Sequence, residues 1–266
     1  MDHKLAGRAS SARRLLLRVM EWVAPVAVLL LFWEWAANSA GLPRFILPSF
    51  RDTLDRFGRT LLDGSLLFHS AITLSEILLG LLVGSLTATV LGYRIARSRR
   101  LERMLSPYVV ASQAIPVVAL APLLVIWLGP GMAAKVLICA LIVFFPILVN
   151  TIVGIRAVPG ALHDLMHSLH ATRWQILRKL EIPAALPVFL GGLRIGATLS
   201  VIGAVVGELV GADRGLGFLV NVGRGQYDTA LVFVAVLTLI ALAMALYGGV
   251  AWIESRALVW QERRDQ

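Results

Sequence analysis

The sequence has few charged residues and a single cysteine. Only 15% of its 266 residues are Asp, Glu, Lys or Arg, against about 25% in a typical soluble globular chain. One cysteine, Cys139, excludes a disulfide scaffold, which needs several paired cysteines. Hydrophobic residues make up 58% of the chain, which excludes intrinsic disorder. Both deviations are in the direction expected of a membrane protein.

Long stretches of the chain lack charge. The net charge of +9 could indicate nucleic-acid binding, but such proteins gather their basic residues on a soluble domain, and here the charges border apolar runs instead. A membrane span needs about 20 mainly apolar residues. Six stretches meet this condition: 22–40 with Glu34, 70–93 with Glu76, 104–134, 136–155, 188–210 with Arg194 and Glu208, and 229–253. The sequence therefore predicts an all-α, polytopic membrane protein with six transmembrane helices and no nucleic-acid partner.

The distribution of Lys and Arg predicts the orientation of these helices. Eighteen of the 25 lie before the first span, in the loop 94–103, in the segment 156–194 or after the last span. The alternate loops hold the other seven, with Lys135 between the third and fourth spans. Because Lys and Arg concentrate on the cytoplasmic side, both termini are predicted to be cytoplasmic.

The spans divide the chain into three parts. Residues 1–21 are predicted to be a cytoplasmic segment, residues 22–255 the six-helix membrane domain and residues 256–266 a cytoplasmic tail. The basic N-terminus resembles a targeting signal, but the apolar run from Trp22 is long for a signal core. We therefore expect a retained first helix.

The segment 156–187, between the fourth and fifth spans, has a helical apolar pattern. Pro159-Gly160 opens it, Pro183 closes it, and His170-Ala171-Thr172 interrupts it. Apolar residues recur at three- and four-residue spacing, which places them on one helix face: Leu162, Leu165, Met166, Leu169, Ile176, Leu177 and Leu180. We expect two short helices with a turn between them. Their apolar stripe must be buried against some surface, and the membrane domain itself and the lipid interface are two candidates.

Motifs of several enzyme classes are missing. The sequence has no G-x-x-x-x-G-K-[ST] phosphate loop, so it does not hydrolyse nucleotide by that route, and no G-x-S-x-G nucleophile elbow. His163 and His167 have i, i+4 spacing but lack the Glu of H-E-x-x-H, so no metal site is expected. The chain is expected to be neither an enzyme nor the holder of a cofactor.

Three polar residues inside the predicted spans are candidates for a substrate pathway. Ionisable groups within a membrane are costly and are functional candidates by default, which singles out Glu76 and Glu208. Gln113 is polar within the third span, where Pro116 frees a backbone carbonyl. The alternatives are hydrogen bonding between helices and, for Glu208, proximity to water.

The stretch 164–183 resembles the cytoplasmic signature of ATP-binding-cassette importer permeases. That signature is an E-A-A run, a Gly four residues after its second Ala, about nine residues, and I-x-L-P. With the same spacing, Asp164-Leu165-Met166 stands at E-A-A, His170 at the Gly and Leu180-Glu181-Ile182-Pro183 at the last block. The residue identities differ from those of the signature: Asp replaces Glu, Leu and Met replace the two Ala residues, and His replaces Gly. Two flanking runs are similar to the family's usual continuation: Ala171-Thr172-Arg173-Trp174-Gln175 and Ile182-Pro183-Ala184-Ala185-Leu186-Pro187.

The resemblance covers nearly the whole chain and narrows to one branch of the family. It includes Leu47-Pro48-Ser49, the runs 115–123 and 211–217, and Trp127-Leu128-Gly129. The combination is similar to permeases for nitrate, taurine, aliphatic sulfonates, riboflavin and thiamine-precursor pyrimidines. The runs 164–169 and 178–183 favour riboflavin or a thiamine-precursor pyrimidine as the substrate.

Other functions remain open at this point. An aliphatic sulfonate, taurine or nitrate would be an alternative substrate for the same class of importer. A more distant alternative is an ion-coupled secondary carrier with Glu76 or Glu208 as the coupling group, although no two related halves are visible. A membrane scaffold protein is a third.

The resemblance implies a fold and a set of partners. The fold is that of a type I importer permease, a multi-pass protein of the inner (plasma) membrane of a bacterial cell. The permease would be a homodimer bound by two cytoplasmic ATP-binding subunits, which use the ATP, and by an external substrate-binding protein. In this family the helix pair after the fourth span docks in a groove of the ATPase, so residues 160–180 would couple ATP hydrolysis to transport. His170-Ala171-Thr172 would form the turn, and Arg173 would pair with ATPase carboxylates. The residues implied in the contact are Asp164, Leu165, Met166, Leu169, His170, Ala171, Thr172 and Arg173.

Overall fold

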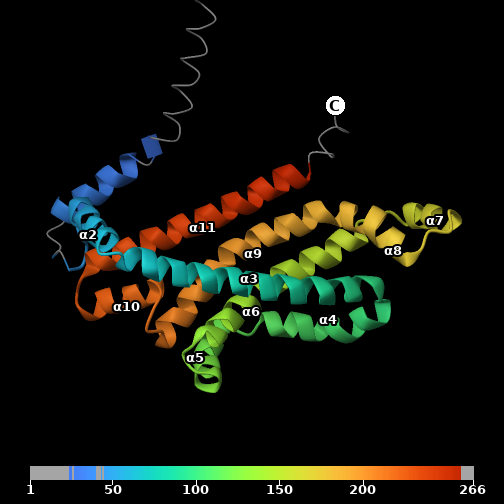
Figure 1. Cartoon of the computed structure of the whole chain (residues 1–266), viewed down its shortest axis with the longest axis horizontal. Coiled ribbons are helices and arrows are strands. Elements are labelled where there is room, and N and C mark those ends of the chain that lie inside the picture. Colours follow the sequence, from blue (N-terminus) through green and yellow to red (C-terminus); the bar gives the residue numbers. More distant parts are fainter. Residues whose placement is uncertain (1–23, 26, 40–42, 44, 259–266) are drawn as a thin grey trace, which may run out of the picture.

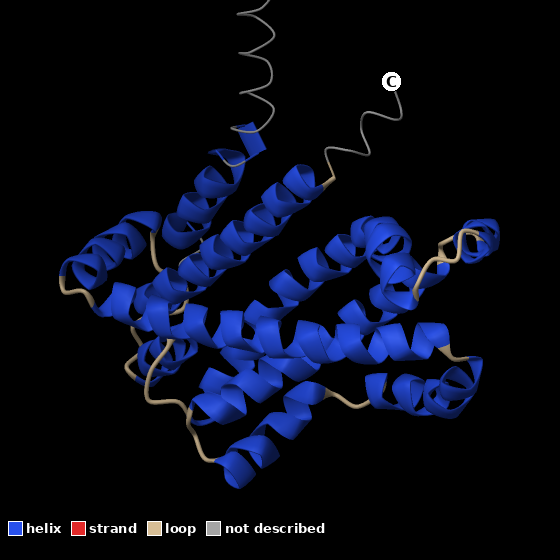
Figure 2. Cartoon of the chain, turned by 45° about the vertical axis from the view of Figure 1, so that its right-hand side comes forward, coloured by secondary structure: helices blue, strands red, loops and turns tan. Residues whose placement is uncertain are grey.

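The computed structural model describes residues 24, 25, 27–39, 43 and 45–258. In this part of the chain every regular element is a helix, which confirms the all-α prediction (Figure 2). Residues 27–39 are helical and precede the elements labelled in Figure 1. These are α2 Phe50–Leu62, α3 Ser65–Arg97, α4 Arg99–Gln113, α5 Val117–Leu128, α6 Met132–Arg156, α7 Gly160–Ser168, α8 Arg173–Ile176, a π-helical turn Leu177–Glu181, α9 Ile182–Gly211, α10 Leu216–Gly225 and α11 Thr229–Ala257.

Four of the described helices are long and apolar enough to cross a membrane. They are α3, α6, α11 and the continuous run Arg173–Gly211, which joins α8, the π-helical turn and α9. They contain the predicted spans 70–93, 136–155, 188–210 and 229–253. The predicted segment 1–21 lies outside the described residues, as do parts of the span 22–40 and most of the tail 256–266.

The predicted third span, 104–134, is broken at Pro116, the proline expected to free a backbone carbonyl. Two helices, α4 and α5, meet there at a bend of 92° (Figure 1). Pro116 is the N-cap of α5 and has no backbone N–H, so it cannot continue the hydrogen bonding of α4. The residue before a proline also favours extended conformations over helix. Counted as one broken span, the pair gives a fifth crossing.

The central helix of the membrane domain is α6, which packs against both α3 and α9. Glycines allow the three backbones to approach closely, as small residues do between membrane helices. A Cβ added at Gly84 of α3 would lie 2.7 Å from the carbonyl oxygen of Ala140. One added at Gly203 of α9 would lie 2.8 Å from the Cα of Cys139, which is fully buried. Direct backbone contact therefore fixes the spacing of these helices.

The variant Gly84→Val tests this packing. The added side chain would push α3 away from the backbone of α6, and we expect a loss of about 1–3 kcal/mol in the free energy of unfolding. Gly248→Val on α11 is the matched control, because a Cβ there meets nothing within 4 Å. Thermal unfolding of the purified proteins in detergent compares the two, and equal midpoints would contradict the close approach of α3 and α6.

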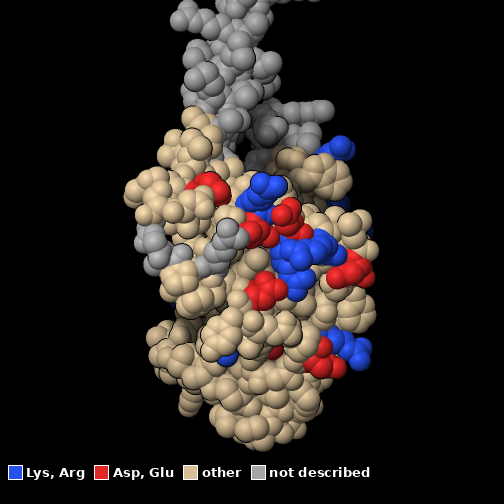
Figure 3. Space-filling view, turned by 90° about the vertical axis from the view of Figure 1, so that its left-hand side faces the viewer, with Lys and Arg blue, Asp and Glu red and all other residues tan. Residues whose placement is uncertain are grey.

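Polar contacts cap α2 and join it to the start of α11 at one end of the molecule. The hydroxyl of Ser49 accepts a hydrogen bond from the Asp52 backbone N–H at 3.1 Å and caps α2. Arg56 of α2 pairs with Asp228, the N-cap of α11, at 2.8 Å between Nε and Oδ2. Figure 3 shows acidic and basic side chains mingled on this face, which we call the α2 end. The opposite end carries α7 and α8 and is called the α7 end (Figure 1).

Candidate functional site

The segment between α6 and α9 folds as two short helices, α7 and α8, joined by a tight turn. This confirms the prediction of a helix pair interrupted at His170-Ala171-Thr172. In Figure 1 the pair projects at the α7 end of the molecule. We call residues 160–176 the α7–α8 hairpin.

The turn of the hairpin is a Schellman motif with histidine at the left-handed position. The His170 N–H donates to the carbonyl of His167 at 2.9 Å, and the Ala171 N–H donates to the carbonyl of Met166 at 3.0 Å. The φ of His170 is 51°. Glycine is the usual residue at this position because it has no Cβ. His170 thus has the conformation for which a glycine is suited, at the place where the importer signature has one.

The variant His170→Gly is expected to stabilise the turn. A side chain in the left-handed region costs roughly 1–2 kcal/mol, so its removal should raise the unfolding temperature slightly. The control His167→Gly lies within α7, where glycine should cost about 1 kcal/mol. Thermal unfolding of both variants measures the effect, and a lower midpoint for His170→Gly than for wild type would contradict the assigned geometry.

A capping box fixes the start of α8. The Gln175 N–H donates to Thr172 Oγ1 at 3.3 Å, and the Thr172 N–H donates to Gln175 Oε1 at 2.8 Å. Arg173 is therefore held at the first helical position, and it is exposed. The end of α8 differs from the prediction, in which Pro183 closes the helical segment. The chain continues through a π-helical turn directly into α9, and Pro183 lies in the first turn of α9, next to the π-helical turn.

The apolar stripe of the hairpin is only partly covered. Ile176 is buried, whereas Leu165 is 52% exposed and Leu169 is 67% exposed. Trp174 is 66% exposed. Of the eight predicted contact residues, Met166 and Ala171 are half-buried and six are exposed: Asp164, Leu165, Leu169, His170, Thr172 and Arg173. The membrane domain of this chain therefore leaves most of the predicted contact surface free.

A second group of polar residues is buried among the membrane helices. Lys135 Nζ lies 2.7 Å from Glu76 Oε1, with the two side chains 6% and 0% exposed. The carboxyl groups of Glu76 and Glu208 are close enough to interact. The prediction that placed Lys135 in a loop is wrong, because α6 begins at Met132 and includes it. The sequence does carry one signal of a buried position, because Lys135 is the one Lys or Arg between Arg103 and Arg156.

Glu208 organises the loop between α9 and α10. Its Oε1 accepts a hydrogen bond from Thr73 Oγ1 at 2.6 Å, and its Oε2 accepts one from the Gly217 N–H at 2.6 Å. Thr73 in turn accepts from the Leu216 N–H at 2.8 Å. At Gly215 the φ is +109° and an added Cβ would lie 1.9 Å from Glu208 Oε1. Glu208 is thus enclosed by α3 and by the start of α10.

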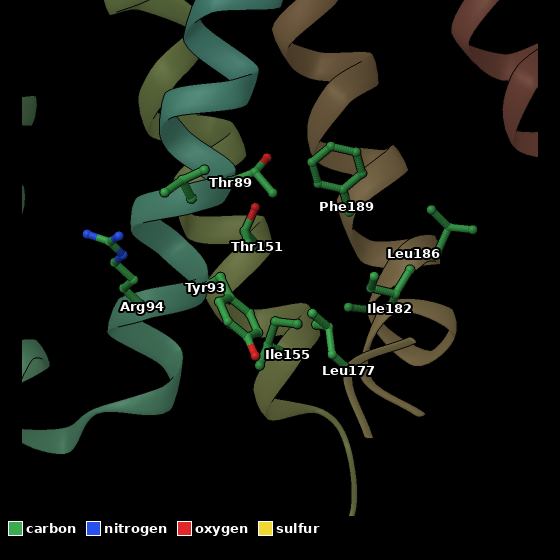
Figure 4. Close-up of a pocket in the computed structure, with 11 residues that line it drawn as sticks. Thr89, Tyr93, Arg94, Thr151, Ile155, Leu177, Ile182, Leu186 and Phe189 are labelled. Carbon is green, nitrogen blue, oxygen red and sulfur yellow. The ribbon is translucent and has the colours of Figure 1, made fainter. Parts of the chain in front are cut away.

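Gln113 is separate from these carboxylates. It is exposed at the end of α4, where its Nε2 donates to the Val109 carbonyl at 3.4 Å. A mainly apolar cavity of about 480 Å³ opens between α3, α6 and α9 toward the α7 end (Figure 4). None of Glu76, Gln113 and Glu208 lines it. The structure therefore brings Glu76 and Glu208 together and leaves Gln113 apart.

The histidines form no metal centre in the described part of the chain, where no three His, Cys, Asp or Glu side chains group suitably. His163 Nε2 instead lies 3.9 Å from Glu181 Oε1. His167 borders a cavity between the hairpin and the end of α3. Glu181 was not selected from the sequence, because in the signature it occupies the variable position of I-x-L-P.

Residues 80–259 match the family described as the binding-protein-dependent transport system inner membrane component. The match includes the α7–α8 hairpin and all of α6, α9 and α11. The chain belongs to this family. It is the membrane-embedded permease subunit of an ATP-binding-cassette importer, with the type I importer permease fold.

Curated relatives of the permease span nearly its whole length. It is 45% identical over 250 residues to the riboflavin transport system permease protein RibX of Chloroflexus aurantiacus, covering 92% of this chain and 93% of the relative. It is 36% identical to the formylaminopyrimidine transport permease protein ThiX of Halalkalibacterium halodurans, covering 89% and 94%. Identity to the taurine transport system permease protein TauC of Escherichia coli is 30%, covering 90% and 88%.

Solved structures of ABC transporters share the fold of the permease. An inward-facing MetNI methionine ABC transporter superposes with a TM-score of 0.62 at 20% identity, covering 70% of this chain and 93% of that chain. An amino acid ABC transporter superposes with a TM-score of 0.58 at 17% identity, covering 77% and 97%. The permease is accordingly a multi-pass inner-membrane protein, and ATP hydrolysis takes place in a separate subunit.

Proposed function

We propose that the permease carries riboflavin or a thiamine-precursor pyrimidine, with riboflavin favoured. The observation that carries this proposal is the 45% identity to a riboflavin permease over 92% of the chain. Identity falls to 36% for the formylaminopyrimidine permease and to 30% for the taurine permease. Riboflavin and the pyrimidine are both nitrogen heterocycles, whereas taurine and the aliphatic sulfonates carry an anionic sulfonate group. The net charge of +9 does not favour a substrate with an anionic group, because the positions of 18 of the 25 basic residues follow from the predicted orientation of the chain in the membrane.

Uptake in whole cells tests the substrate. The permease is expressed with its ATP-binding and substrate-binding partners in a riboflavin auxotroph that has no riboflavin importer of its own. We expect saturable uptake of radiolabelled riboflavin that requires the ATP-binding subunit and resists a large excess of taurine. Competition by formylaminopyrimidine would move the proposal to the pyrimidine. Uptake of an aliphatic sulfonate or taurine, with none of riboflavin, would reject it.

We further propose that the α7–α8 hairpin docks on the ATP-binding subunit through Asp164–Arg173. The exposed Leu165 and Leu169 supply an apolar surface that a protein partner would cover. Arg173, exposed at the start of α8, would pair with carboxylates of that partner. A helix with uncovered apolar residues beside an exposed basic one fits a groove with an acidic rim.

We also propose how the permease is assembled and oriented in the membrane. A second copy of the chain would complete a homodimer, with the substrate pathway bordered by Gln113, Glu76 and Glu208. Residues 1–21 and 256–266 would be cytoplasmic and would flank the membrane domain 22–255. In this orientation the α7 end faces the cytoplasm and the α2 end faces the substrate-binding protein.

A further inference from the structure

A buried carboxylate connects the α7–α8 hairpin to the end of α3. The side chain of Glu181 is 1% exposed, and its Oε1 lies 3.2 Å from Arg97 Nη1. Tyr93 Oη donates to Glu181 Oε2 at 3.4 Å, and Arg97 Nε donates to Tyr93 Oη at 3.2 Å. His163 of α7 approaches the same carboxylate to 3.9 Å. We call Tyr93, Arg97, His163 and Glu181 the Glu181 link.

The link is placed where the hairpin becomes a membrane helix. Glu181 is the last residue of the π-helical turn Leu177–Glu181, which lies between α8 and α9. Such turns occur frequently at functional sites. Because the helix is continuous from Arg173 to Gly211, a displacement of α8 passes directly into α9. The displacement of α8 cannot pass along the chain to α3 in this way, because α3 is distant in the sequence.

The space beside the link is open. A cavity of about 730 Å³ lies between the end of α3 and the hairpin, with Arg97 of α3 and Leu101 of α4 on one side and Arg173 and Ile176 on the other. The hairpin is therefore not packed tightly onto α3 there, and the polar contacts of Glu181 bridge the two elements. A buried carboxylate is strongly held to its cation, because separating them leaves an uncompensated charge.

We propose that Glu181 is a positioning residue that makes α3 follow the hairpin. When the ATP-binding subunit displaces the hairpin, α9 moves through its continuous helix and α3 moves through the Glu181 link. The two membrane helices on either side of α6 then change position together. This inference rests on the proposed docking of the hairpin on the ATP-binding subunit.

The variant Glu181→Gln removes the charge and keeps the shape of the side chain. In proteoliposomes that hold the complete transporter, we expect basal ATP hydrolysis to persist. Riboflavin imported per ATP hydrolysed should fall about tenfold, within the range typical of coupling free energies. The matched control is Glu102→Gln, which breaks the pair of Glu102 with Arg156 between α4 and α6, where both side chains are about one-third exposed. That control should leave the ratio unchanged.

A double-mutant cycle separates the link from a general loss of structure. Arg97→Gln alone should be worse than Glu181→Gln, because it leaves the carboxylate buried without its cation. The double variant should match Glu181→Gln, since the two residues act as one unit. Independent, additive effects on the ratio would overturn the inference. Should Glu181→Gln fail to accumulate, Tyr93→Phe removes one hydroxyl of the link and should lower the ratio less.

The outcomes distinguish a wrong inference about the Glu181 link from a wrong docking proposal or a wrong substrate. If Arg173→Glu uncouples transport but Glu181→Gln does not, the link is rejected and hairpin docking stands. If Glu181→Gln uncouples transport but Arg173→Glu does not, the docking proposal is rejected. If wild type imports no riboflavin, the substrate is wrong. In that case the measured quantity is the stimulation of ATP hydrolysis by the substrate-binding protein. This stimulation should be lost in Glu181→Gln and kept in the control Glu102→Gln.

Discussion

Replacing Lys135 by methionine is expected to lower the free energy of unfolding of the permease by about 3–5 kcal/mol, the cost of breaking a buried ion pair from one side. Lys135 Nζ lies 2.7 Å from Glu76 Oε1, and both side chains are buried. Without the ammonium group, Glu76 would be left beside Glu208 as a second buried carboxylate. The side chain of Glu76 has no exposed surface through which bulk water could solvate it.

Removing both partners should recover most of this loss. In Lys135→Met/Glu76→Met the unpaired charge is gone, and apolar side chains of similar size replace the pair. Glu208 keeps its hydrogen bonds from Thr73 and the Gly217 N–H. Thermal unfolding in detergent measures the three proteins. A double variant less stable than Lys135→Met would contradict the pairing, and so would a Lys135→Met protein as stable as wild type.

Reversing the charge of Arg173 is expected to uncouple ATP hydrolysis from import. Arg173 is exposed at the start of α8, and Arg173→Glu would place a carboxylate against the acidic rim that we propose for the docking groove. Substrate imported per ATP hydrolysed should fall about tenfold or more, while the amount of permease in the membrane stays at the wild-type level. Proteoliposome assays measure the ratio, and immunoblots of membrane fractions measure the amount.

Arg100→Glu is the matched control for this variant. Arg100 is exposed at the same end of the molecule, in the first turn of α4 and outside the hairpin. It should leave the ratio near the wild-type value. Equal effects of the two variants would indicate a general response to charge at this end and would reject a specific role for Arg173.

Much of the fold could be predicted from where charges are absent. Long charge-free runs correspond to α6 and α11, because a hydrocarbon core admits few unpaired charges. The hairpin was also visible, since its apolar spacing stops at His170-Ala171-Thr172, where the structure turns. Local sequence determines both features, so a sequence pattern suffices to find them.

The errors came from features that depend on contacts between distant residues. A charge count places Lys135 at the end of a span, because its partner Glu76 lies 59 positions earlier and their pairing is not visible in the sequence. In the charge-free run 104–134, Pro116 indicates a break in the backbone hydrogen bonding, but the 92° size of the bend could not be predicted from the run alone. Glu181 was overlooked for the same reason, as its partners Tyr93 and Arg97 are on another helix.

Site-specific cross-linking tests the central claim most directly, namely that the α7–α8 hairpin is the surface on which the ATP-binding subunit acts. Cys139, the one native cysteine, is first replaced by serine, and Leu169→Cys is then introduced into the active, assembled transporter. Leu169 is 67% exposed on the hairpin, and Leu62, 90% exposed at the α2 end, is the control position. We expect a thiol-reactive cross-linker to join position 169, and not position 62, to the ATP-binding subunit. A transporter that imports substrate yet gives no cross-link from position 169, or one from position 62, would contradict the claim.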